Sequence, residues 1–574
     1  MPGIYGFLST KGKEVGINLF KNFHSYDIPN TINEERKYNN FLFGRSVIPK
    51  FLKDRVIYED EEIIIVLEGT STNIERGRLV NVLKKEFKKD NYAFANKIEG
   101  SFSGVIYDKL SSRLFLFTDQ LSTKPLYYYL NKDNGVFFFA SELKVISKAL
   151  RESGHRISID NDGIRCLLTF GYMLSDITPI TEIKKIEHGS IFKLDIKSFK
   201  LFKKQYFPLE KSKANNASKN ELIEEVDRLL ISAVDREWNK DKEYGYDHFA
   251  FLSGGLDSRV NVMLADKLGY KPSNLLTFSE EGTLDEMISR KIAKDLGLKH
   301  TFISLNDGKY LEDNLSKYIS QNDGLVVLYG AAHMADSVGK IDLKSYGYSH
   351  SGQIGDALFG SLYKVSSPDE NLNKLCYGKN LEIVDKIEVW NEMKSNNYGG
   401  DDFEIFSYKY RVVNGVLNGD RSISSLIDSI SPFYDKELFN FCINLPTAFK
   451  NNSLFYKDWM KQKHREIQSY KWQASGTYPR NGFYTDLINF GNRVIRYGRR
   501  KIGIEKENMN PFQSWYNRNE KLSNSLKRIY EENIHLVDDH ELKLDITNEF
   551  NSSSATDKLN AISAILSIKL HFFK

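Results

Sequence analysis

A short apolar run, a pair of glycines and a helical pattern follow one another directly between residues 248 and 268. The run "HFAFL" predicts a buried strand over 248–252, and Gly254 and Gly255 predict a tight turn after it. Beyond Asp257, apolar residues recur at helical spacing, so one packed face is expected to carry Val260, Met263, Leu264 and Leu268. A strand that turns sharply into a helix is typical of a parallel α/β fold.

The start of this helix is a predicted anion site. Backbone N–H groups and the positive end of the helix dipole meet there, and the hydroxyls of Ser253 and Ser258 add donors. Asp257 adds a carboxylate, which suits Mg²⁺ bridging phosphate oxygens. No lysine follows the second glycine, so the pattern of the γ-phosphoryl-transferring nucleotide hydrolases is missing. The loop therefore indicates a phosphate chain with its metal.

The pattern along the chain changes once. Residues 3–205 form a series of short β-type runs, interrupted by a helical pattern in "ERGRLVNVLKKEF". The stretch 210–220 has no large apolar residue and is interpreted as a linker, with a surface loop inside one domain as the alternative. Helices then alternate with brief strands, which indicates a parallel sheet. We therefore predict domains over 1–209 and 221–574, joined by the linker 210–220.

Composition sets outer limits on function. A chain of 574 residues exceeds one ordinary core, so at least two domains are expected. A net charge of +4 is too weak to indicate a nucleic-acid partner. No apolar run approaches the roughly 20 residues of a membrane helix, so no integral membrane segment is predicted. Three scattered cysteines indicate neither a disulfide framework nor a zinc site, and a reducing cytoplasm fits them best: Cys166, Cys376 and Cys442.

The SGGLDS loop resembles the pyrophosphate loop of the asparagine synthetase family. The likeness continues in "DEMISRKIAKDLGLKH" (285–300), "SGQIGDALFGS" (351–361) and "SPFYDKELFNFCINLP" (431–446), in the family's order. The first half also resembles the family's glutaminase domain, in "GSFSGVIYD", "TDQLSTKPLYY" and "FFFASELK". The resemblance covers close to 450 residues and weakens after about residue 485. It implies an N-terminal Ntn-type αββα sandwich followed by a pyrophosphate-loop α/β domain of the adenine nucleotide α-hydrolase-like type.

The resemblance also implies a chemistry and a set of site residues. Family members use ATP to activate a carboxylate as an acyl-adenylate. Two aspartates hold Mg²⁺ against the pyrophosphate, and the matching positions here are Asp257 and Asp356. The nucleotide is expected to lie against Leu252, Ser253, Gly254, Gly255, Asp257, Ser258 and Gly352.

The glutaminase half departs from the family at its nucleophile. The family begins Met-Cys-Gly and uses that cysteine, whereas this chain begins "MPGIYGF" with Pro2. The glutamine-binding run, about NGEIYN in the family, is "EGTSTN" here: Gly69 and Asn73 persist, but Glu68 and Thr70 replace an oxyanion donor and a substrate-binding acid. A scaffold without glutaminase activity is therefore predicted. The alternative is that the amine of Pro2, exposed by methionine removal, acts as a base or nucleophile.

The acceptor side of the second half also departs from the family. Gln353 stands where the glutamine-dependent enzymes have an acid. Asp428 lies near the position at which the β-lactam-forming relatives keep a glutamate partner. Aligning the family's R-x-K element puts Trp472 and Ala474 at the basic places, with Lys471 shifted beside them. Gln353, Asp428 and Lys471 are therefore the candidate catalytic residues, although another cation or different chemistry remains open in place of Lys471.

Two further segments have ordinary interpretations. The run "NRVIRYGRRKIG" (492–503) is expected to be a solvated helix face, with a surface for an anionic substrate or bilayer as the alternative; its cations are Arg493, Arg496, Arg499, Arg500 and Lys501. The tail "KLNAISAILSIKLHFFK" has apolar residues near helical spacing and is expected to be a packed terminal helix.

The predicted function is that of an ATP-dependent, AMP-forming amide ligase with Mg²⁺. It joins a carboxylate to ammonia or an amine without hydrolysing glutamine, and the carboxylate is a small molecule, a sugar acid or a peptide. β-Lactam synthetases, lasso-peptide cyclases and sugar-acid amidating enzymes are relatives with this kind of divergence. The runner-up is asparagine synthesis from free ammonia or with a partner glutaminase, and the third hypothesis is a nucleotide-binding pseudoenzyme. A homodimer is left open.

Overall fold

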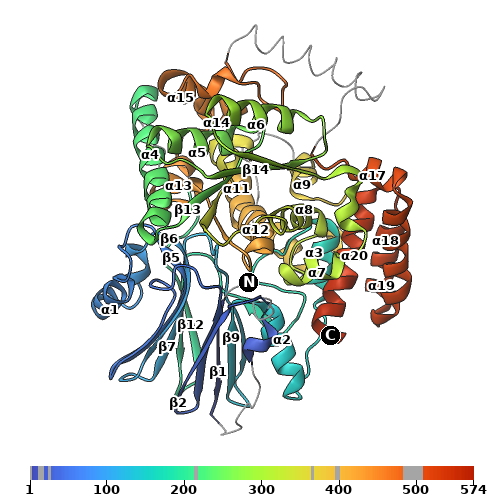
Figure 1. Cartoon of the computed structure of the whole chain (residues 1–574). Helices are drawn as coiled ribbons and strands as arrows, with labels where there is room; N and C mark the ends of the chain where they lie inside the picture. Colours follow the sequence, from blue (N-terminus) through green and yellow to red (C-terminus); the bar gives the residue numbers. More distant parts are fainter. Residues whose placement is uncertain are drawn as a thin grey trace.

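The computed structural model describes residues 3–10, 19–23, 28–212, 217–362, 368–394, 401–481 and 509–573. Pro2 and the basic run 492–503 lie outside the described residues. Within these ranges a sandwich of antiparallel sheets is followed by a parallel α/β unit and a group of C-terminal helices (Figure 1).

Two six-stranded antiparallel sheets form the first half. One has the order β10-β8-β9-β1-β3-β2 and the other β12-β11-β7-β6-β5-β4. The first sheet consists of β1 (Gly3–Ser9), β2 (Ile32–Tyr38), β3 (Phe41–Val47), β8 (Tyr127–Asn131), β9 (Val136–Ala140) and β10 (Ile183–Lys185). The second consists of β4 (Ile57–Glu59), β5 (Ile63–Ser71), β6 (Gly100–Asp108), β7 (Arg113–Thr118), β11 (Ser190–Asp195) and β12 (Lys200–Gln205).

Strand β5 shows why four layers form. Its side chains point alternately to opposite faces, and those of its first five residues, 63–67, are all apolar, so both faces must be covered. Ile64 and Val66 pack into the core between the two sheets, whereas Ile63 and Ile65 pack against α1 (Leu79–Lys89). On the other side, α2 (Leu143–Glu152) and α3 (Asn161–Thr169) cover the first sheet. The first half is therefore an αββα sandwich.

The second half is built on a five-stranded sheet in the order β15-β14-β13-β16-β17, with every pair parallel. The strands are β13 (Asp247–Phe251), β14 (Asn274–Ser279), β15 (His300–Ser304), β16 (Tyr346–His350) and β17 (Asp428–Ile430). Strand β14 pairs with one edge of β13 and β16 pairs with the other, so the strand order reverses there. Such a reversal creates a crevice at the carboxyl ends of β13 and β16. Helices α4 (Lys219–Tyr244), α5 (Leu256–Lys267) and α6 (Leu284–Asp295) flank the sheet.

Helix α5 follows the sequence pattern except at its end. Val260, Met263 and Leu264 are buried as expected, but Leu268 is 39% exposed. The helix ends at Lys267, so Leu268 no longer lies on the packed face. The expectation for Leu268 is therefore wrong, and the error is one of helix length.

The C-terminal helices share a core with the first half. The helices are α17 (Phe512–Arg518), α18 (Glu520–Asn533), α19 (His540–Asn551) and α20 (Ala555–Ile568). Ile562 and Ile565 of α20 belong to the same buried cluster as Ile164 of α3 and Val145 of α2. The packed terminal helix predicted from the tail is thus confirmed. Among the described helices, none is both long enough and apolar enough to cross a membrane.

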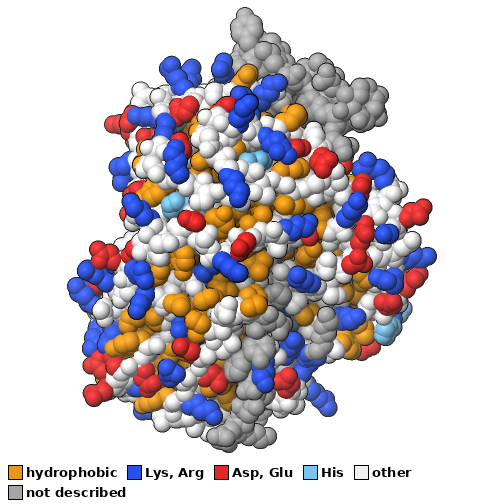
Figure 2. Space-filling model, viewed as in Figure 1, with side chains coloured by type: hydrophobic (Ala, Val, Ile, Leu, Met, Phe, Trp, Pro, Cys, Tyr) orange, Lys and Arg blue, Asp and Glu red, His pale blue; other side chains and the backbone are white. Residues whose placement is uncertain are grey.

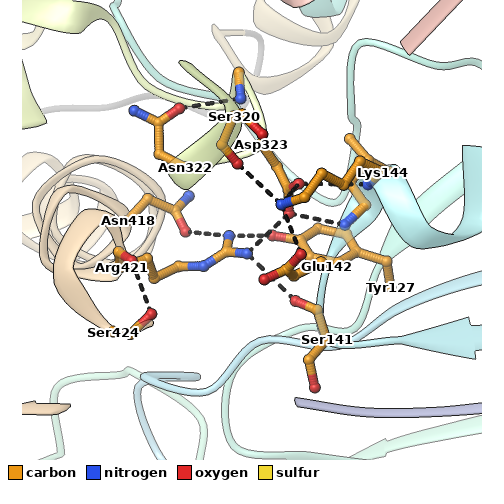
Figure 3. A network of polar contacts seen from close by, with 12 residues as sticks. Tyr127, Ser141, Glu142, Lys144, Ser320, Asn322, Asp323, Asn418, Arg421 and Ser424 are labelled. Carbon is orange, nitrogen blue, oxygen red and sulfur yellow. Dashed lines mark hydrogen bonds and ion pairs between the residues drawn. The ribbon is translucent and has the colours of Figure 1, made fainter. Parts of the chain in front are cut away.

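A buried network of charges also joins the two halves (Figure 3). The Asp323 carboxylate accepts hydrogen bonds from the N–H of Leu143 at 2.8 Å, from Lys144 at 3.3 Å and from Arg421 at 3.2 Å. Arg421 also donates to the hydroxyl of Tyr127 at 2.7 Å. The helix start of α2 is thereby fixed to the segment that carries Arg421, η8 (Arg421–Ile423).

The predicted linker has contacts at its first residues. Lys211 forms an ion pair of 2.7 Å with the buried Glu404, and the N–H of Ser212 donates to Asn444 at 2.7 Å. The boundary at 210–220 stays a prediction.

On the face shown in Figure 2, basic and acidic side chains are interspersed and leave no large area of one sign.

Candidate functional site

The loop Ser253–Gly255 joins β13 to α5 at the carboxyl edge of the parallel sheet. Its own N–H groups are already bonded: that of Ser253 donates to Ser258 Oγ at 3.0 Å, and that of Gly255 to Ser253 Oγ at 3.1 Å. The two hydroxyl oxygens lie 3.1 Å apart, so one hydroxyl proton is shared between them and the other can still donate to an anion. Phosphate is therefore offered a hydroxyl and the first N–H groups of α5, rather than the glycine N–H groups.

The same loop is held from outside by Asp285 and Thr277. The N–H of Gly254 donates to Asp285 Oδ1 at 2.9 Å, from the first turn of α6. The carbonyl of Leu252 accepts a hydrogen bond from Thr277, and the Leu252 side chain is buried. Leu252 therefore supports the loop from beneath, with its side chain in the core.

The second loop, Gly352–Asp356, lies directly on the first. A Cβ atom on Gly352 would come within 2.2 Å of the Ser258 nitrogen, and one on Gly355 within 2.7 Å of Asp257 Cγ. Only glycine allows this approach. Between them Ile354 has φ of 63°, a strained value for a β-branched residue and one of the kind that clusters at functional sites.

The two loops bring Asp257 and Asp356 together. The N–H of Asp356 donates to Asp257 Oδ2 at 3.0 Å, and Asp257 Oδ1 is buried without a hydrogen-bond partner among the described residues. Burial raises the pKa of Asp257 well above its ordinary value, and the charge of Asp356 raises it further. A divalent cation would satisfy both the orphaned oxygen and the repulsion between the carboxylates, and oxygen ligands are those that Mg²⁺ prefers. The residues therefore fit a magnesium ion.

Gln353 lies in a hydrogen-bonded group that the sequence did not predict. Its Nε2 donates to Asp420 Oδ1 at 3.0 Å, and the Tyr434 hydroxyl donates to Asp420 Oδ2 at 2.7 Å. Burial raises the pKa of Asp420 to about 6, against the hydrogen bonds that lower it. Asp420 ends α12 (Leu417–Asp420) and was missed because nothing in "NGDRS" marks it. Tyr434 lies inside the PF-x-D element.

Asp428, by contrast, faces the first half. Its carboxylate is ion-paired with Arg55 and with Lys124, and all three side chains are buried. Glu68 completes the group, with Oε1 at 3.6 Å from both Arg55 Nε and Lys124 Nζ. The structure thus does not pair Asp428 with Gln353, whose carboxylate partner is Asp420 instead.

The segment around Lys471 lies against the SGGLDS loop. The Lys471 carbonyl accepts a hydrogen bond of 2.6 Å from Arg259, but the Lys471 side chain is exposed. The N–H of Gln473 donates to the Gly254 carbonyl at 3.2 Å. Gln473 is therefore the side chain of this segment that packs closest to the glycines, where a Cβ on Gly254 would come within 2.8 Å of it.

Arg259 explains how this segment is held. Its side chain is fully buried and donates to four backbone carbonyls, at 3.1 and 3.2 Å for Ile467 and Tyr470 and at 3.1 Å for Gly254, besides Lys471. All of these partners are neutral carbonyls on two segments far apart in sequence. Sequence reasoning missed Arg259, since a single arginine in the first turns of a helix is usually exposed.

Two family models match the chain in succession. The model of the glutamine amidotransferase domain matches residues 57–207, and that of asparagine synthase matches residues 225–380. Asparagine synthetase 1 of Bacillus subtilis, named as glutamine-hydrolysing, is 26% identical over 331 residues, or 53% of this chain and 48% of that protein.

Two proteins of Methanocaldococcus jannaschii, provisionally named as glutamine-hydrolysing asparagine synthetases, are also similar. One is 31% identical over 261 residues, covering 42% of this chain and 49% of that protein. The other is 25% identical over 419 residues, covering 69% and 67%. The alignments to the first two relatives thus span about half of the relatives' length. Both domain models and these similarities agree: the chain belongs to the asparagine synthetase family.

Proposed function

We propose that the chain is an ATP-dependent carbon–nitrogen ligase that forms AMP and pyrophosphate. A substrate carboxylate attacks the α-phosphorus of ATP, the bond to the β-phosphate oxygen breaks, and pyrophosphate leaves. Ammonia or an amine then attacks the acyl carbon of the adenylate, loses a proton and displaces AMP. The observation that carries the proposal is the pair of carboxylates, Asp257 and Asp356, set against the start of α5.

The residues of the two loops have distinct tasks in this reaction. Asp257 and Asp356 would hold Mg²⁺, which when bound supplies positive charge to the leaving pyrophosphate. The hydroxyl of the Ser253 and Ser258 pair that remains free to donate, together with the first N–H groups of α5, orients the phosphate chain. Arg259 keeps the loop and the 467–471 segment in one position, so these donors need not reorganise during the reaction.

The acceptor side is assigned to Gln353, Asp420 and Tyr434. Asp420, with its raised pKa of about 6, can accept a proton from an attacking amine near neutral pH. Gln353 fixes the orientation of that carboxylate through the 3.0 Å hydrogen bond. Lys471, exposed and beside the loop, is the cation proposed to neutralise the transition state.

We also propose that the first half no longer hydrolyses glutamine. Pro2 offers no thiol, and it lies outside the described residues. At the remaining glutamine-binding places, Glu68 is turned into the buried ion-pair group with Asp428, and the Thr70 hydroxyl is hydrogen-bonded to that of Tyr348. Both substituted side chains are thus engaged in contacts with or near the second half, which leaves neither of them to hold a glutamine substrate. The amine donor then comes from solution or from another protein.

Three free cysteines support a reducing compartment such as the cytoplasm. The carboxylate is proposed to be a small molecule, a sugar acid or a peptide.

Pyrophosphate exchange tests the proposed ligase. With ATP, Mg²⁺ and a panel of carboxylates that includes aspartate, uronic acids and short peptides, the protein should transfer label from pyrophosphate into ATP for at least one carboxylate. Exchange needs a reversible acyl-adenylate but no amine. A protein that binds ATP and shows no exchange with a broad panel would support the nucleotide-binding hypothesis instead.

A further inference from the structure

A polar cavity lies on the seam between the two halves, away from the SGGLDS loop. On one side it is lined by residues that follow or end β10 and β12, among them Lys185, His188 and Gln205. On the other side it is lined by η7 (Ser407–Val416), the wide π-type turn between α11 (Asp401–Phe406) and α12. Turns of this type are rare and are frequently found at functional sites.

Lys185 is a buried cation with little compensation. Its side chain is 5% exposed, and its ammonium group donates to Asn414 Oδ1 at 2.6 Å. Asn414 cannot rotate away, because its own amide group donates to the carbonyls of Met173 and Ser175. No carboxylate forms an ion pair with Lys185 in the part of the chain that the structure describes. Two of its three N–H donors are therefore left for another partner.

The other charged groups of the cavity do not supply that partner. Asp176 forms an ion pair of 3.4 Å with Lys203, and Glu187 is exposed. Lys409, half-buried on η7, adds a second cation. His188 is buried, and burial lowers its pKa to about 3, with the charge of Lys185 lowering it further, so the imidazole is neutral. The buried end of the cavity thus presents the Lys185 amine with no carboxylate paired to it among the described residues.

We propose that this cavity binds a small oxyanion, the phosphate or carboxylate group of a metabolite, between Lys185 and Lys409. The anion accepts the two remaining Lys185 hydrogen bonds and compensates a charge that burial otherwise penalises. Since η7 continues through α12 to Asp420, a bound anion fixes the helix that carries the acceptor-side carboxylate. The site does not depend on the proposed ligase reaction.

The titration of Lys185 agrees with such a site. Burial lowers the pKa of Lys185 to about 7, and the positive charge of Arg421 lowers it further, against a smaller opposing effect of Asp119. At neutral pH the free site is therefore only partly protonated. An anion favours the charged amine, so binding near pH 7 takes up protons, which calorimetry in buffers of different ionisation enthalpy detects.

The test compares anion binding by the wild type with binding by Lys185→Met and by the control Lys204→Met, which changes an exposed lysine of β12. Inorganic phosphate and acetate are titrated separately, at constant ionic strength, and followed by calorimetry and by the melting temperature. Phosphate that binds at α5 contributes equally to all three proteins. We expect Lys185→Met to weaken the additional site by about tenfold or more, the scale of one hydrogen bond to a charged group, and Lys204→Met to leave it unchanged.

The two anions distinguish the chemical class of the group bound: preference for phosphate indicates a phosphorylated ligand, and preference for acetate a carboxylate. If Lys185→Met binds both anions as the wild type does, the site is wrong. Should Lys185→Met fail to fold, Lys409→Met provides the same comparison from the half-exposed side of the cavity, and unchanged binding in that variant would equally overturn the proposal.

Discussion

The N–H of Asp356 donates a hydrogen bond of 3.0 Å to Asp257 Oδ2, so two loops that follow different strands hold their carboxylates side by side. The arrangement is unfavourable for the protein alone. Asp257 is penalised by burial and by its neighbour, which together raise its pKa well above the ordinary value. The folded protein holds the Asp257 proton more tightly than the unfolded chain does. This contribution to the free energy of unfolding is therefore lost as pH rises through the raised pKa. A divalent cation between the two carboxylates would favour their ionised forms and offset the cost of holding both charges there.

The first prediction concerns nucleotide binding. ATP with Mg²⁺ should raise the melting temperature of the wild type, and Asp257→Asn and Asp356→Asn should each abolish the increase, because each removes one charge from the metal's ligands. The shift is measured by scanning fluorimetry, with ATP and EDTA as the control. Without metal, Asp257→Asn should be relatively more stable at neutral pH than at acid pH, since it lacks the penalised charge. A full shift in both variants would remove them as metal ligands.

The second prediction concerns the pH dependence of stability. Asp420 has a pKa of about 6 in the folded protein, raised by burial from 3.8. Between about pH 4 and 6 the unfolded state loses this proton while the folded state keeps it, so stability falls as pH rises. The contribution reaches about 3 kcal/mol at most. Asp420→Asn should therefore gain stability relative to the wild type as pH rises from 4 to 7.

Chemical denaturation at several pH values measures that difference. The exposed residue Asp538 provides a matched control, because Asp538→Asn should track the wild type across the range. A constant difference between Asp420→Asn and the wild type would show that Asp420 does not carry a raised pKa.

The fold was predictable because its signals are local. Short β-type runs predicted a strand-rich first half, whose αββα arrangement was implied by the family resemblance, and the strand–glycine–helix pattern predicted where β13 turns into α5. The loops with Asp257 and Asp356 each follow a strand, so their meeting at one sheet edge follows from the parallel arrangement. The exposure of Leu268 was not predicted, because apolar spacing locates the packed face of a helix more accurately than its end.

The contacts that complete the site were not predictable in this way. Asp420 supports Gln353 from 67 residues away in sequence, and Arg55 meets Asp428 from 373 residues away. Tertiary packing brings these groups together, within the second half for Asp420 and Gln353 and between the two halves for Arg55 and Asp428. Arg259 reads as an exposed charge in the sequence, because its carbonyl partners are backbone groups that leave no mark on it.

The third prediction separates a structural from a catalytic role of Asp428. Asp428→Asn leaves two buried cations, Arg55 and Lys124, with Glu68 alone, so the variant should lose about 3–5 kcal/mol of stability. Pyrophosphate exchange by the folded fraction should remain as in the wild type. The double variant Lys124→Met/Asp428→Asn should be more stable than the sum of the single losses predicts. Loss of exchange at wild-type stability would instead place Asp428 in the catalytic machinery.

The last prediction concerns the exposed Lys471. If its ammonium group neutralises the transition state of amide formation, Lys471→Ala should lower the rate of product formation by about 10²-fold or more, the scale of one preorganised charge, and affect pyrophosphate exchange less. Once a substrate carboxylate is identified by exchange, both rates are measured on the same preparation, with ammonia as the amine. Lys461→Ala is a suitable control, because Lys461 is also exposed but lies on α15 (Leu454–Lys463), outside the segment bound by Arg259. Equal product rates in Lys471→Ala and the wild type would exclude Lys471 from the reaction, and the search for the cation would move to the residues beside Gln473.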